Sequence, residues 1–513
     1  MATRDSFWES MLAAAAVGIL IGGCLSTPVP SPTSSPLPSP TSTPTAPPTI
    51  GRSPSPPPTA TASQTVTPTS PATPGPSPSA ATEGDVLDQA EIDRHLDALA
   101  RIAGEEGGRR VAGTEGYDAS ADYVAEQLAA MGYEVDRQPF SFTFFDEQAP
   151  VSLVIGEQSW SGAEWLHAML YSAEGVVTGA LETVGILNRQ PVGTAGCEAD
   201  DWNQFVTGRI AVLAAGPCPR RSQVNNAQDA GAIALIGLYP AWGADEIRRP
   251  TLFEPDGIDI PVIVAGEEPS SALLAAAATN ATAEITVDVE MAPASDDNIF
   301  AELPGTSTQV VMLGGHLDSS LDGPGINDNG SGVATLLAMA AAFAERPAPE
   351  HAIRFAFWGA EEFGTHGSRH YVDNLPARER ERIEAYINLD MVGSPNAARF
   401  VYDDEFGESG ASAITVLLLD ALAENGTPGL PISSGGSDHS AFLNAGIATG
   451  GVFSGIAPLT PAEAQTFGGQ AGMPADPCYH LACDDRSNVD TGSAFHLGSA
   501  VATVVWSLAN PDR

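Results

Sequence analysis

Histidine and carboxylate side chains gather just after three apolar stretches of strand length in the second half of the chain. Nitrogen and oxygen ligands without thiolates suit zinc, and also cobalt or manganese. Each motif is weak by itself, because a His-x-Asp pair is common by chance and a Glu-Glu pair is more often the solvated start of a helix. Together, in this order, they are far more specific for a metal site. The residues are His316, Asp318, Glu361, Glu362 and Asp390, with Asp328 in a Gly-rich turn and His480 in a late loop.

The apolar stretches before these motifs predict an α/β fold with a mostly parallel central sheet flanked by helices. Strands of a parallel sheet are buried on both faces, so they read as nearly continuous apolar runs. Reactive groups in such folds gather beyond the carboxyl ends of the strands, which is where these motifs lie. The expected strands span 310–314, 353–358, 385–389 and 448–453, and the expected helices span 331–343 and 411–423.

The first half of the folded region begins in a helical pattern and then changes character. Amphipathic helices are expected at 90–101 and 118–131, and alternation of apolar and polar residues predicts a strand over 134–145. Short strands and turns follow, which indicate a β-rich insert. The expected domains are 85–146 together with 293–513 for the α/β part, and 147–292 for the insert.

The N-terminus resembles the signal of an exported bacterial lipoprotein. A basic start precedes an apolar run, Met11 to Leu20, that is too short to span a bilayer comfortably. Residues 1–23 are therefore expected to be a signal peptide, and Cys24 to become the lipid-bearing first residue; a plain signal peptide with a chance cysteine is the alternative. Residues 24–84 are rich in Pro, Ser and Thr and are expected to form a disordered tether.

The chain of 513 residues is strongly acidic. It carries 64 Asp and Glu against 22 Lys and Arg, a formal net charge of −42. Such a surface repels nucleic acid and anionic lipid headgroups, so neither is expected as a main partner. Contact with a membrane is expected through the lipid anchor alone, and the oligomeric state is not indicated.

The motifs together resemble the dizinc aminopeptidases of the bacterial leucyl aminopeptidase and aminopeptidase Y type. The resemblance covers about 85–146 and 293–513. It implies hydrolysis of N-terminal residues, with apolar ones expected, from peptides that have a free N-terminus. The matching motifs are His-Leu-Asp-Ser at 316–319, Gly-Pro-Gly-Ile-Asn-Asp at 323–328, Glu-Glu at 361–362, Asn-Leu-Asp-Met at 388–391 and Cys-Tyr-His at 478–480.

This resemblance also implies two Zn²⁺ per chain and a role for each motif residue. One zinc ion would be held by His316, Asp328 and Asp390, and the other by Asp328, Glu362 and His480, with Asp328 bridging both. The further roles would be Glu361 as general base on the water between the ions, Tyr479 as donor to the oxyanion, Asp318 as acceptor from the far nitrogen of His316, and Phe453 either as part of an apolar side-chain pocket or as a core strand residue.

Residues 147–292 resemble the protease-associated (PA) domain, a β-rich module inserted into many exported peptidases; an unrelated β insertion is the alternative. The resemblance rests on Cys197, Cys218 and the segments 208–213 and 230–232. A disulfide between these cysteines is plausible in an oxidising compartment. A second disulfide, between Cys478 and Cys483, would stiffen the loop that carries Tyr479 and His480. With Cys24 as the anchor, all five cysteines are then accounted for.

Several other residues of reactive type are expected to have structural roles. His439, in Ser-Asp-His-Ser, looks like a ligand, but in the family this stretch supports the site and the ligand is the later histidine. His366 and His370 follow the Glu pair and are expected at the surface or in packing contacts. Asn329-Gly330-Ser331 matches a glycosylation sequon, but it is expected to belong to the metal turn.

Three functions compete. The first is an aminopeptidase, for which Glu361 and Asp390 could face the free α-amine, although Gly436 stands where some relatives carry Arg. The second is another reaction on the same fold, such as a carboxypeptidase or a glutaminyl cyclase. Carboxypeptidases need cations for the terminal carboxylate, and Arg369 is the only one beside the motifs. The third is a binding protein with a dead site. The intact ligand set, with Asp328 as bridge, disfavours the cyclase and the dead site.

Overall fold

The structure, a computed structural model, describes residues 87–187, 189–238, 247–403, 413–433 and 436–511. The expected signal peptide, Cys24 and the tether lie outside these residues. None of the described helices is both long enough and apolar enough to cross a membrane.

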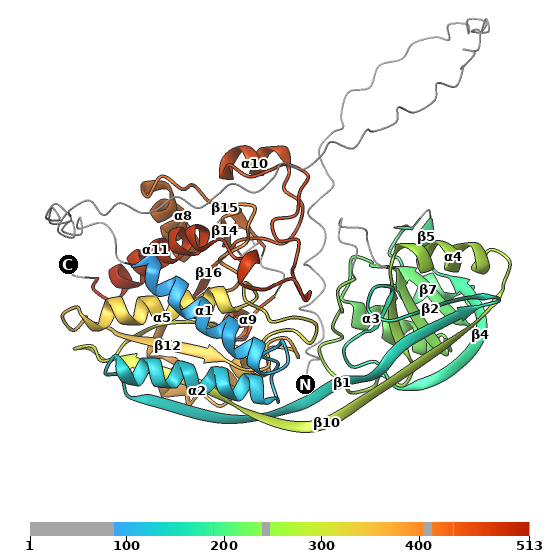
Figure 1. The fold of residues 1–513 in the computed structure, drawn as a ribbon, viewed down its shortest axis with the longest axis horizontal. Coiled ribbons are helices and arrows are strands. Elements are labelled where there is room, and N and C mark those ends of the chain that lie inside the picture. Colours follow the sequence, from blue (N-terminus) through green and yellow to red (C-terminus); the bar gives the residue numbers. More distant parts are fainter. Residues whose placement is uncertain (1–86, 188, 239–246, 404–412, 434–435, 512–513) are drawn as a thin grey trace, which may run out of the picture. The chain divides into compact units, whose positions relative to one another are not determined.

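A sheet of 14 strands forms the scaffold of the folded chain (Figure 1). In spatial order the strands are β15 (Leu430–Ile432), β14 (Phe400–Tyr402), β16 (Thr449–Phe453), β13 (Ile383–Leu389), β11 (Val310–His316), β12 (Ala352–Trp358), β10 (Thr282–Leu303), β4 (Gly175–Thr183), β7 (Ile210–Ala214), β8 (Ala234–Leu238), β9 (Val262–Ala265) and β3 (Leu166–Ala168), with β1 (Val135–Ile155) beside β10 and β2 (Gln158–Ser161) beside β1.

The part of this sheet that contains the motifs is parallel. Strands β16, β13, β11 and β12 pair in parallel, and antiparallel β14 and β10 flank them. These four strands are the ones expected from the apolar runs, and the mostly parallel sheet is confirmed. Because they run in the same direction, their carboxyl ends lie at one edge, where His316 ends β11 and Phe453 ends β16.

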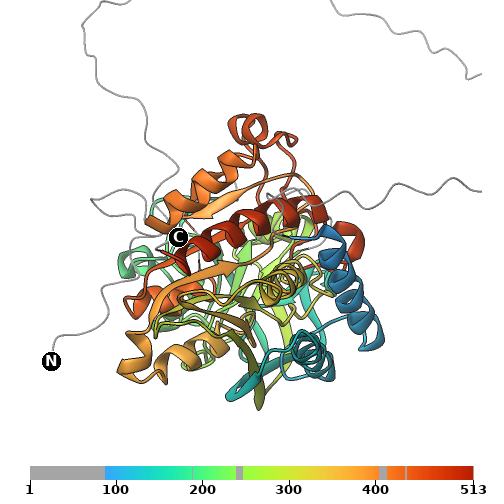
Figure 2. The same ribbon diagram turned by 90° about the vertical axis from the view of Figure 1, so that its left-hand side faces the viewer.

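Helices cover both faces of the parallel strands. Alternate side chains of β11 separate the two faces: Val311 and Leu313 join one apolar cluster, and Met312 joins another with Tyr371 and Phe442. Helices α1, α5 and α11 contact one another on the first face (Figures 1 and 2). The first face carries α1 (Gln89–Glu105), α2 (Glu115–Ala130), α5 (Gly330–Ala344) and α11 (Thr491–Leu508), and the second carries α6 (His366–Asp373) and α9 (His439–Asn444).

Helix α1 illustrates how the sequence forms these elements. Its buried residues Ile92, Leu96 and Leu99 recur every three or four positions and so line one face. The side chain of Asp88 accepts a hydrogen bond from the backbone N–H of Ala90 and caps the first turn. The helix expected at 90–101 is confirmed, and it continues to Glu105.

Strands β1 and β10 form a long two-stranded ribbon that extends from the α/β part into the insert (Figure 1). The start of β10, residues 282–287, pairs with β4 of the insert, and its end, residues 299–303, pairs with β12. The strand expected at 134–145 therefore continues to Ile155, because β10 supplies backbone partners along this whole length. Within the insert, β7, β8 and β9 are parallel and accompany α3 (Arg220–Asp229) and α4 (Glu267–Ala277).

Both expected disulfides are present, between Cys197 and Cys218 and between Cys478 and Cys483. The helix expected at 411–423 corresponds to α8 (Ala413–Glu424), of which the structure describes the part from Ala413 onward. The other remaining elements are short. They are β5 (Ile186–Leu187), β6 (Gln190–Pro191), η1 (Ala199–Trp202), α7 (Ala377–Arg380), α10 (Pro461–Phe467) and η2 (Arg486–Asn488).

Candidate metal centre

The bridging carboxylate expected from the sequence, Asp328, lies between two histidines. Its Oδ1 is 3.2 Å from Nε2 of His316, and its Oδ2 is 3.1 Å from Nε2 of His480. Asp390 Oδ1 lies 3.4 Å from the same nitrogen of His316, and Glu362 Oε2 lies 3.0 Å from that of His480. The five side chains thus form two groups of three that share Asp328, and in each group the possible ligand atoms lie within 4.8 Å of one another.

These donors fit zinc in both chemistry and spacing. Zinc takes imidazole nitrogens and carboxylate oxygens at about 2.0–2.2 Å, so neighbouring ligands of a tetrahedral ion lie roughly 3.4 Å apart. Glu362 Oε1 is buried and has no hydrogen-bond partner among the described residues. A buried carboxylate oxygen of this kind is costly unless it is paired or coordinates a cation.

The buried charges perturb one another strongly. Burial raises the pKa of Glu362 to about 6, although His480 opposes the shift. Burial acts in the same direction on Asp328, but hydrogen bonds with His316 and His480 outweigh it and hold the pKa of Asp328 well below its usual range. Three carboxylates converging on two imidazoles make a strongly negative site, which favours a divalent cation.

Asp318 fixes the turn that separates Glu361 from Glu362. Its carboxylate accepts the backbone N–H groups of both glutamates, at 3.1 and 3.2 Å. Ala360, just before them, has a φ of 53°, so the chain leaves the strand in an irregular turn. Nδ1 of His316 lies 3.1 Å from the carbonyl oxygen of Asp318 and 3.7 Å from its carboxylate. Both the main-chain carbonyl and the carboxylate of Asp318 therefore face Nδ1 of His316, and the carbonyl is the nearer of the two.

Glu361 is the carboxylate that this turn leaves outside both ligand groups. Burial raises its pKa well above the ordinary value, and the nearby Asp438 and Glu362 add to the effect. A group with this environment has the raised basicity that a general base requires.

Asp390 is held by a chain of hydrogen bonds that starts in the apolar core. Ser437 Oγ donates to Asp390 Oδ2 at 2.8 Å and accepts from the amide of Asn388 at 3.0 Å. The amide oxygen of Asn388 accepts from the hydroxyl of Tyr386, which in turn accepts from the indole N–H of Trp358, both at 2.8 Å. Every donor in the chain points toward the metal site.

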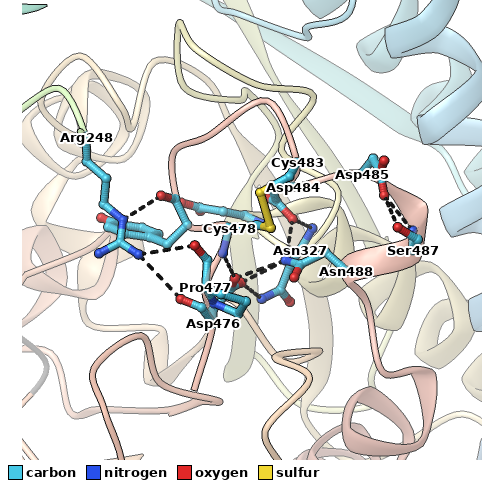
Figure 3. The surroundings of a disulfide bond; sticks show 12 residues. Arg248, Asn327, Asp476, Pro477, Cys478, Cys483, Asp484, Asp485, Ser487 and Asn488 are labelled. Atoms are coloured by element: carbon cyan, nitrogen blue, oxygen red, sulfur yellow. Dashed lines mark hydrogen bonds between the residues drawn. A yellow bond between two sulfur atoms is a disulfide. The ribbon is translucent and has the colours of Figure 1, made fainter. Parts of the chain in front are cut away.

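The loop that carries His480 is joined to the turn that carries Asp328 (Figure 3). The carboxylate of Asp484 accepts the backbone N–H groups of Asn327 and Asp328, at 2.9 and 3.0 Å. The amide of Asn327 donates to Asp476 at 2.6 Å. The two elements therefore position each other, although they lie far apart in the sequence.

A cavity of about 310 Å³ opens beside Glu362 and His480. Residues of the insert line it together with residues of the α/β part. Phe453 does not line it; its ring packs 6.3 Å from that of Tyr402 instead. The lining residues are Leu170, Arg220, Arg248, Arg249, Pro250, Thr251, Phe253, Ser320, Leu321, Asp322, Glu362, Phe363, Ile456, Tyr479 and His480.

Three arginines in this lining were missed by the sequence analysis. Arg369 was taken as the only cation beside the motifs, but the fold brings Arg220, Arg248 and Arg249 of the insert there, while Arg369 pairs with Glu254. These arginines lie far from the motifs along the chain, so nothing in the sequence indicated that they come close to the metal site. The cavity beside the metal ligands is therefore not poor in cations, and a carboxypeptidase is not disfavoured for that reason.

Arg110 is another residue that the motifs did not indicate. It is fully buried and donates to the carbonyl groups of Leu317, Pro324 and Gly325. It thereby holds both the end of β11 and the start of the metal turn. Its position in a Gly-rich loop with a second arginine, Arg109, was the only signal in the sequence.

The other histidines lie outside both ligand groups. His439 is buried and stacks on the ring of Tyr402 at 4.7 Å, and neither His366 nor His370 belongs to a group. His366 packs against Phe142. The amide of Asn329 is buried in the metal turn, where it donates to Leu389 and accepts from Gly332. This buried amide is not accessible for glycosylation.

Comparisons with known proteins agree with this geometry. The family model described as Peptidase family M28 matches residues 298–505, and the PA domain model matches residues 177–273. The fold and the PA-like insert expected from the sequence are confirmed.

Relatives extend the match over most of the chain. An aminopeptidase of Pseudomonas aeruginosa is 38% identical over 82% of this chain and 80% of its own length. A probable lipoprotein aminopeptidase of Mycobacterium tuberculosis, LpqL, is 35% identical over 80% of this chain and 83% of its own length. The solved aminopeptidase from Aneurinibacillus sp. strain AM-1 aligns with a TM-score of 0.66 at 25% identity, over 83% of this chain and 94% of that one. With this extent of similarity, the chain belongs to peptidase family M28.

Proposed function

We propose that this protein is a zinc-dependent aminopeptidase that removes residues, apolar ones foremost, from the free N-terminus of peptides. The observation that carries the proposal is the position of Asp328, whose two oxygens each face a different histidine. Two zinc ions per chain would share this carboxylate. The relatives named aminopeptidases, which are similar over most of this chain, support the reaction class.

Zinc, when bound here, would polarise the scissile carbonyl and activate the attacking water. His316, Asp328 and Asp390 would hold one ion, and Asp328, Glu362 and His480 the other. Glu361 would take the proton of the attacking water and pass it to the leaving amine. Burial raises the pKa of Glu361 above its ordinary value, which increases its basicity toward the attacking water.

Tyr479 would stabilise the negative charge that develops on the carbonyl oxygen. It lines the cavity beside His480, and its ring stacks on that histidine at 3.8 Å. A phenol O–H in a water-poor site is a strong donor to such an oxyanion. Burial raises the pKa of Tyr479 well above its ordinary value, so it keeps its proton.

The apolar part of the cavity supports a preference for apolar side chains. Phe253, Phe363 and Ile456 are among its lining residues, and none of them was a candidate in the sequence analysis. Phe253 comes from the insert, so the insert contributes to the substrate pocket.

A carboxypeptidase is the second candidate, and the cationic side chain of Arg220 in the cavity wall favours it. The two activities separate cleanly on blocked peptides. An aminopeptidase cleaves Leu-Gly-Gly amide but not N-acetyl-Leu-Gly-Gly, whereas a carboxypeptidase shows the opposite preference.

The first experiment measures release of p-nitroaniline from leucine p-nitroanilide by the full chain, with zinc content determined in parallel. Chelation should abolish the activity, and zinc should restore it. Glu361→Gln should lower kcat by about 10²–10⁴ while zinc stays bound, because it removes the base but no ligand. Glu362→Gln, the matched variant one residue away, should lose zinc. Retention of full activity by Glu361→Gln would refute the mechanism.

The location of the protein is also a proposal. Residues 1–23 would direct export, and Cys24 would carry the lipid; the lipoprotein relative of Mycobacterium tuberculosis and the two disulfides support an extracytoplasmic site. Replacement of Cys24 by Ala should move the protein from the detergent-rich to the aqueous phase of a Triton X-114 extraction. An unchanged distribution would contradict the anchor.

A further inference from the structure

Arg248 reaches from the insert to the loop that carries Tyr479 and His480 (Figure 3). Its Nε donates to the carbonyl oxygen of Tyr479 at 2.9 Å, and its Nη2 lies 3.5 Å from the carbonyl oxygens of Asp476 and Pro477. The guanidinium carbon lies 5.5 Å from the centroid of the Tyr479 ring. A single buried side chain of the insert therefore contacts three carbonyl groups and one ring of this loop.

The neighbouring Arg249 anchors the backbone from which Arg248 extends. It donates to both carboxylate oxygens of Asp322, at 3.0 and 3.1 Å, and to Glu147 at 2.7 Å. Its side chain is only 8% exposed, so this paired charge is well shielded from water. The planar fork of an arginine fixes direction as well as distance in such bidentate contacts.

The contacts of Arg249 also lead to the loop that carries His480. Asp322 precedes Gly323, which packs so tightly on the His480 loop that an added Cβ would lie 2.2 Å from the carbonyl oxygen of Leu481. Arg248 thus contacts this loop directly, and Arg249 contacts the residue before Gly323, which packs on the same loop.

The loop's other restraints act mainly on its ends. The disulfide joins Cys478 to Cys483, while Asp476 and Asp484 are held by Asn327 and Asn488. The main chain of Tyr479 lies between these fixed points, and Arg248 is the partner that holds its carbonyl group.

We propose that Arg248 is a positioning residue of the active site, which orients Tyr479 so that the PA-like insert completes the catalytic site of the α/β domain. The inference rests on the proposed function, because it assigns Arg248 the task of aiming the oxyanion donor. It gives the insert a role in the chemistry itself, in addition to its part in lining the cavity.

The first test measures hydrogen exchange of the full-length chain, with no substrate present. Arg248→Met should raise the exchange rates of the amides in 478–484 by about 10- to 100-fold, the range that corresponds to the loss of a charge-assisted hydrogen bond. Arg209→Met is the matched control, because Arg209 contacts Glu182 and Asn280 within the insert. Equal rates in the two variants would show that Arg248 does not hold the loop.

The second test is a double-mutant cycle on leucine p-nitroanilide. Arg248→Met should lower kcat by roughly 10-fold with KM changed less than about 3-fold, whereas in a Tyr479→Phe background it should cost less than about 3-fold in kcat. A merely structural role predicts the same loss in both backgrounds, and that result would refute the inference. Arg248→Lys, which keeps a cationic donor, should give a kcat between those of the wild type and Arg248→Met. If Arg248→Met does not fold, Arg248→Lys replaces it in both the hydrogen-exchange measurement and the double-mutant cycle.

The two tests keep the inference separate from the function it rests on. A wild-type chain without aminopeptidase activity would defeat the proposed function, and the exchange rates would still decide whether Arg248 holds the loop. An active wild type with an additive cycle, or with unchanged exchange in 478–484, would leave the proposed function intact and overturn this inference alone.

Discussion

Ser437 donates a hydrogen bond of 2.8 Å to the carboxylate oxygen of Asp390 that faces away from His316. The hydroxyl is itself fixed by Asn388, so it holds Asp390 in the rotamer that directs its other oxygen toward the metal site. Partners of this kind orient metal ligands, and their loss typically lowers metal affinity by about 10- to 100-fold.

Ser437→Ala should therefore weaken zinc binding by about that factor at the site of His316 and Asp390. Competition with a chromogenic chelator measures the change. Ser120→Ala is the control, because this buried hydroxyl donates to Gly116 within α2, far along the chain from the ligands. Equal zinc affinities in the two variants would show that the contact does not orient Asp390.

The shared position of Asp328 leads to a prediction about stoichiometry. Asp328→Asn should abolish stable binding of both zinc ions, because the amide lacks the second anionic oxygen that each half of the site requires. Asp390→Asn should remove one ion and leave the group of Glu362 and His480 intact. Metal analysis after gel filtration distinguishes the two. Retention of one zinc by Asp328→Asn would mean that the two groups do not depend on a common ligand.

The two disulfides should differ in what they stabilise. The Cys197–Cys218 bond closes a separation of 21 residues and the Cys478–Cys483 bond one of 5. Chain-entropy arguments then give about 3 kcal/mol of stability for the first and about 2 kcal/mol for the second. Removal of the first pair by Ala substitution should lower the urea midpoint more.

Activity should show the opposite order, because the second bond lies in the loop of Tyr479 and His480. Replacement of Cys478 and Cys483 by Ala should lower kcat at least about 10-fold, while the other pair should leave kcat within about 2-fold. Rates measured well below both unfolding midpoints test this. A larger loss of kcat from the insert pair would place the active site under the control of the insert's own stability.

Three of the motifs could be found from the sequence because they lie at or just after the carboxyl end of a strand. His316, Glu362 and Asp390 come directly after apolar runs, and parallel pairing brings such ends to one edge of a sheet. His480 and Tyr479 lie in a loop without a strand before them, so the resemblance to known aminopeptidases was needed to assign their roles.

What the sequence did not show are contacts between segments that lie far apart along the chain. Arg248 acts on residues more than 200 positions later, and Arg110 holds turns that are equally remote. Arginine is also usually exposed on the protein surface, so its type alone carries no signal. The hydrogen bond between His316 and the main-chain carbonyl of Asp318 was not anticipated, because a motif specifies side chains and not backbone carbonyl groups.

Acid stability should depend on His95, a histidine outside both ligand groups. His95 in α1 is fully buried; its Nδ1 lies 2.8 Å from the hydroxyl of Tyr123, and its Nε2 accepts from Arg94 at 3.1 Å. Burial, assisted by the charge of Arg94, lowers the pKa of His95 to about 3. The folded protein therefore keeps this imidazole neutral under conditions where the unfolded chain, with a pKa of about 6.5, is protonated.

The sign of the effect follows from which state binds the proton. Between about pH 6.5 and pH 3 the unfolded chain takes up a proton at His95 that the folded chain refuses, so stability falls as the pH falls, by at most about 1.4 kcal/mol per pH unit. His95→Gln removes this contribution. At pH 7.5 the variant should be the less stable protein, because it loses the packing of the ring against Tyr123. The difference in urea midpoint between the wild type and His95→Gln should narrow steadily from pH 6.5 to pH 4.5. A gap independent of pH would show that His95 titrates in the folded protein much as it does in the unfolded chain.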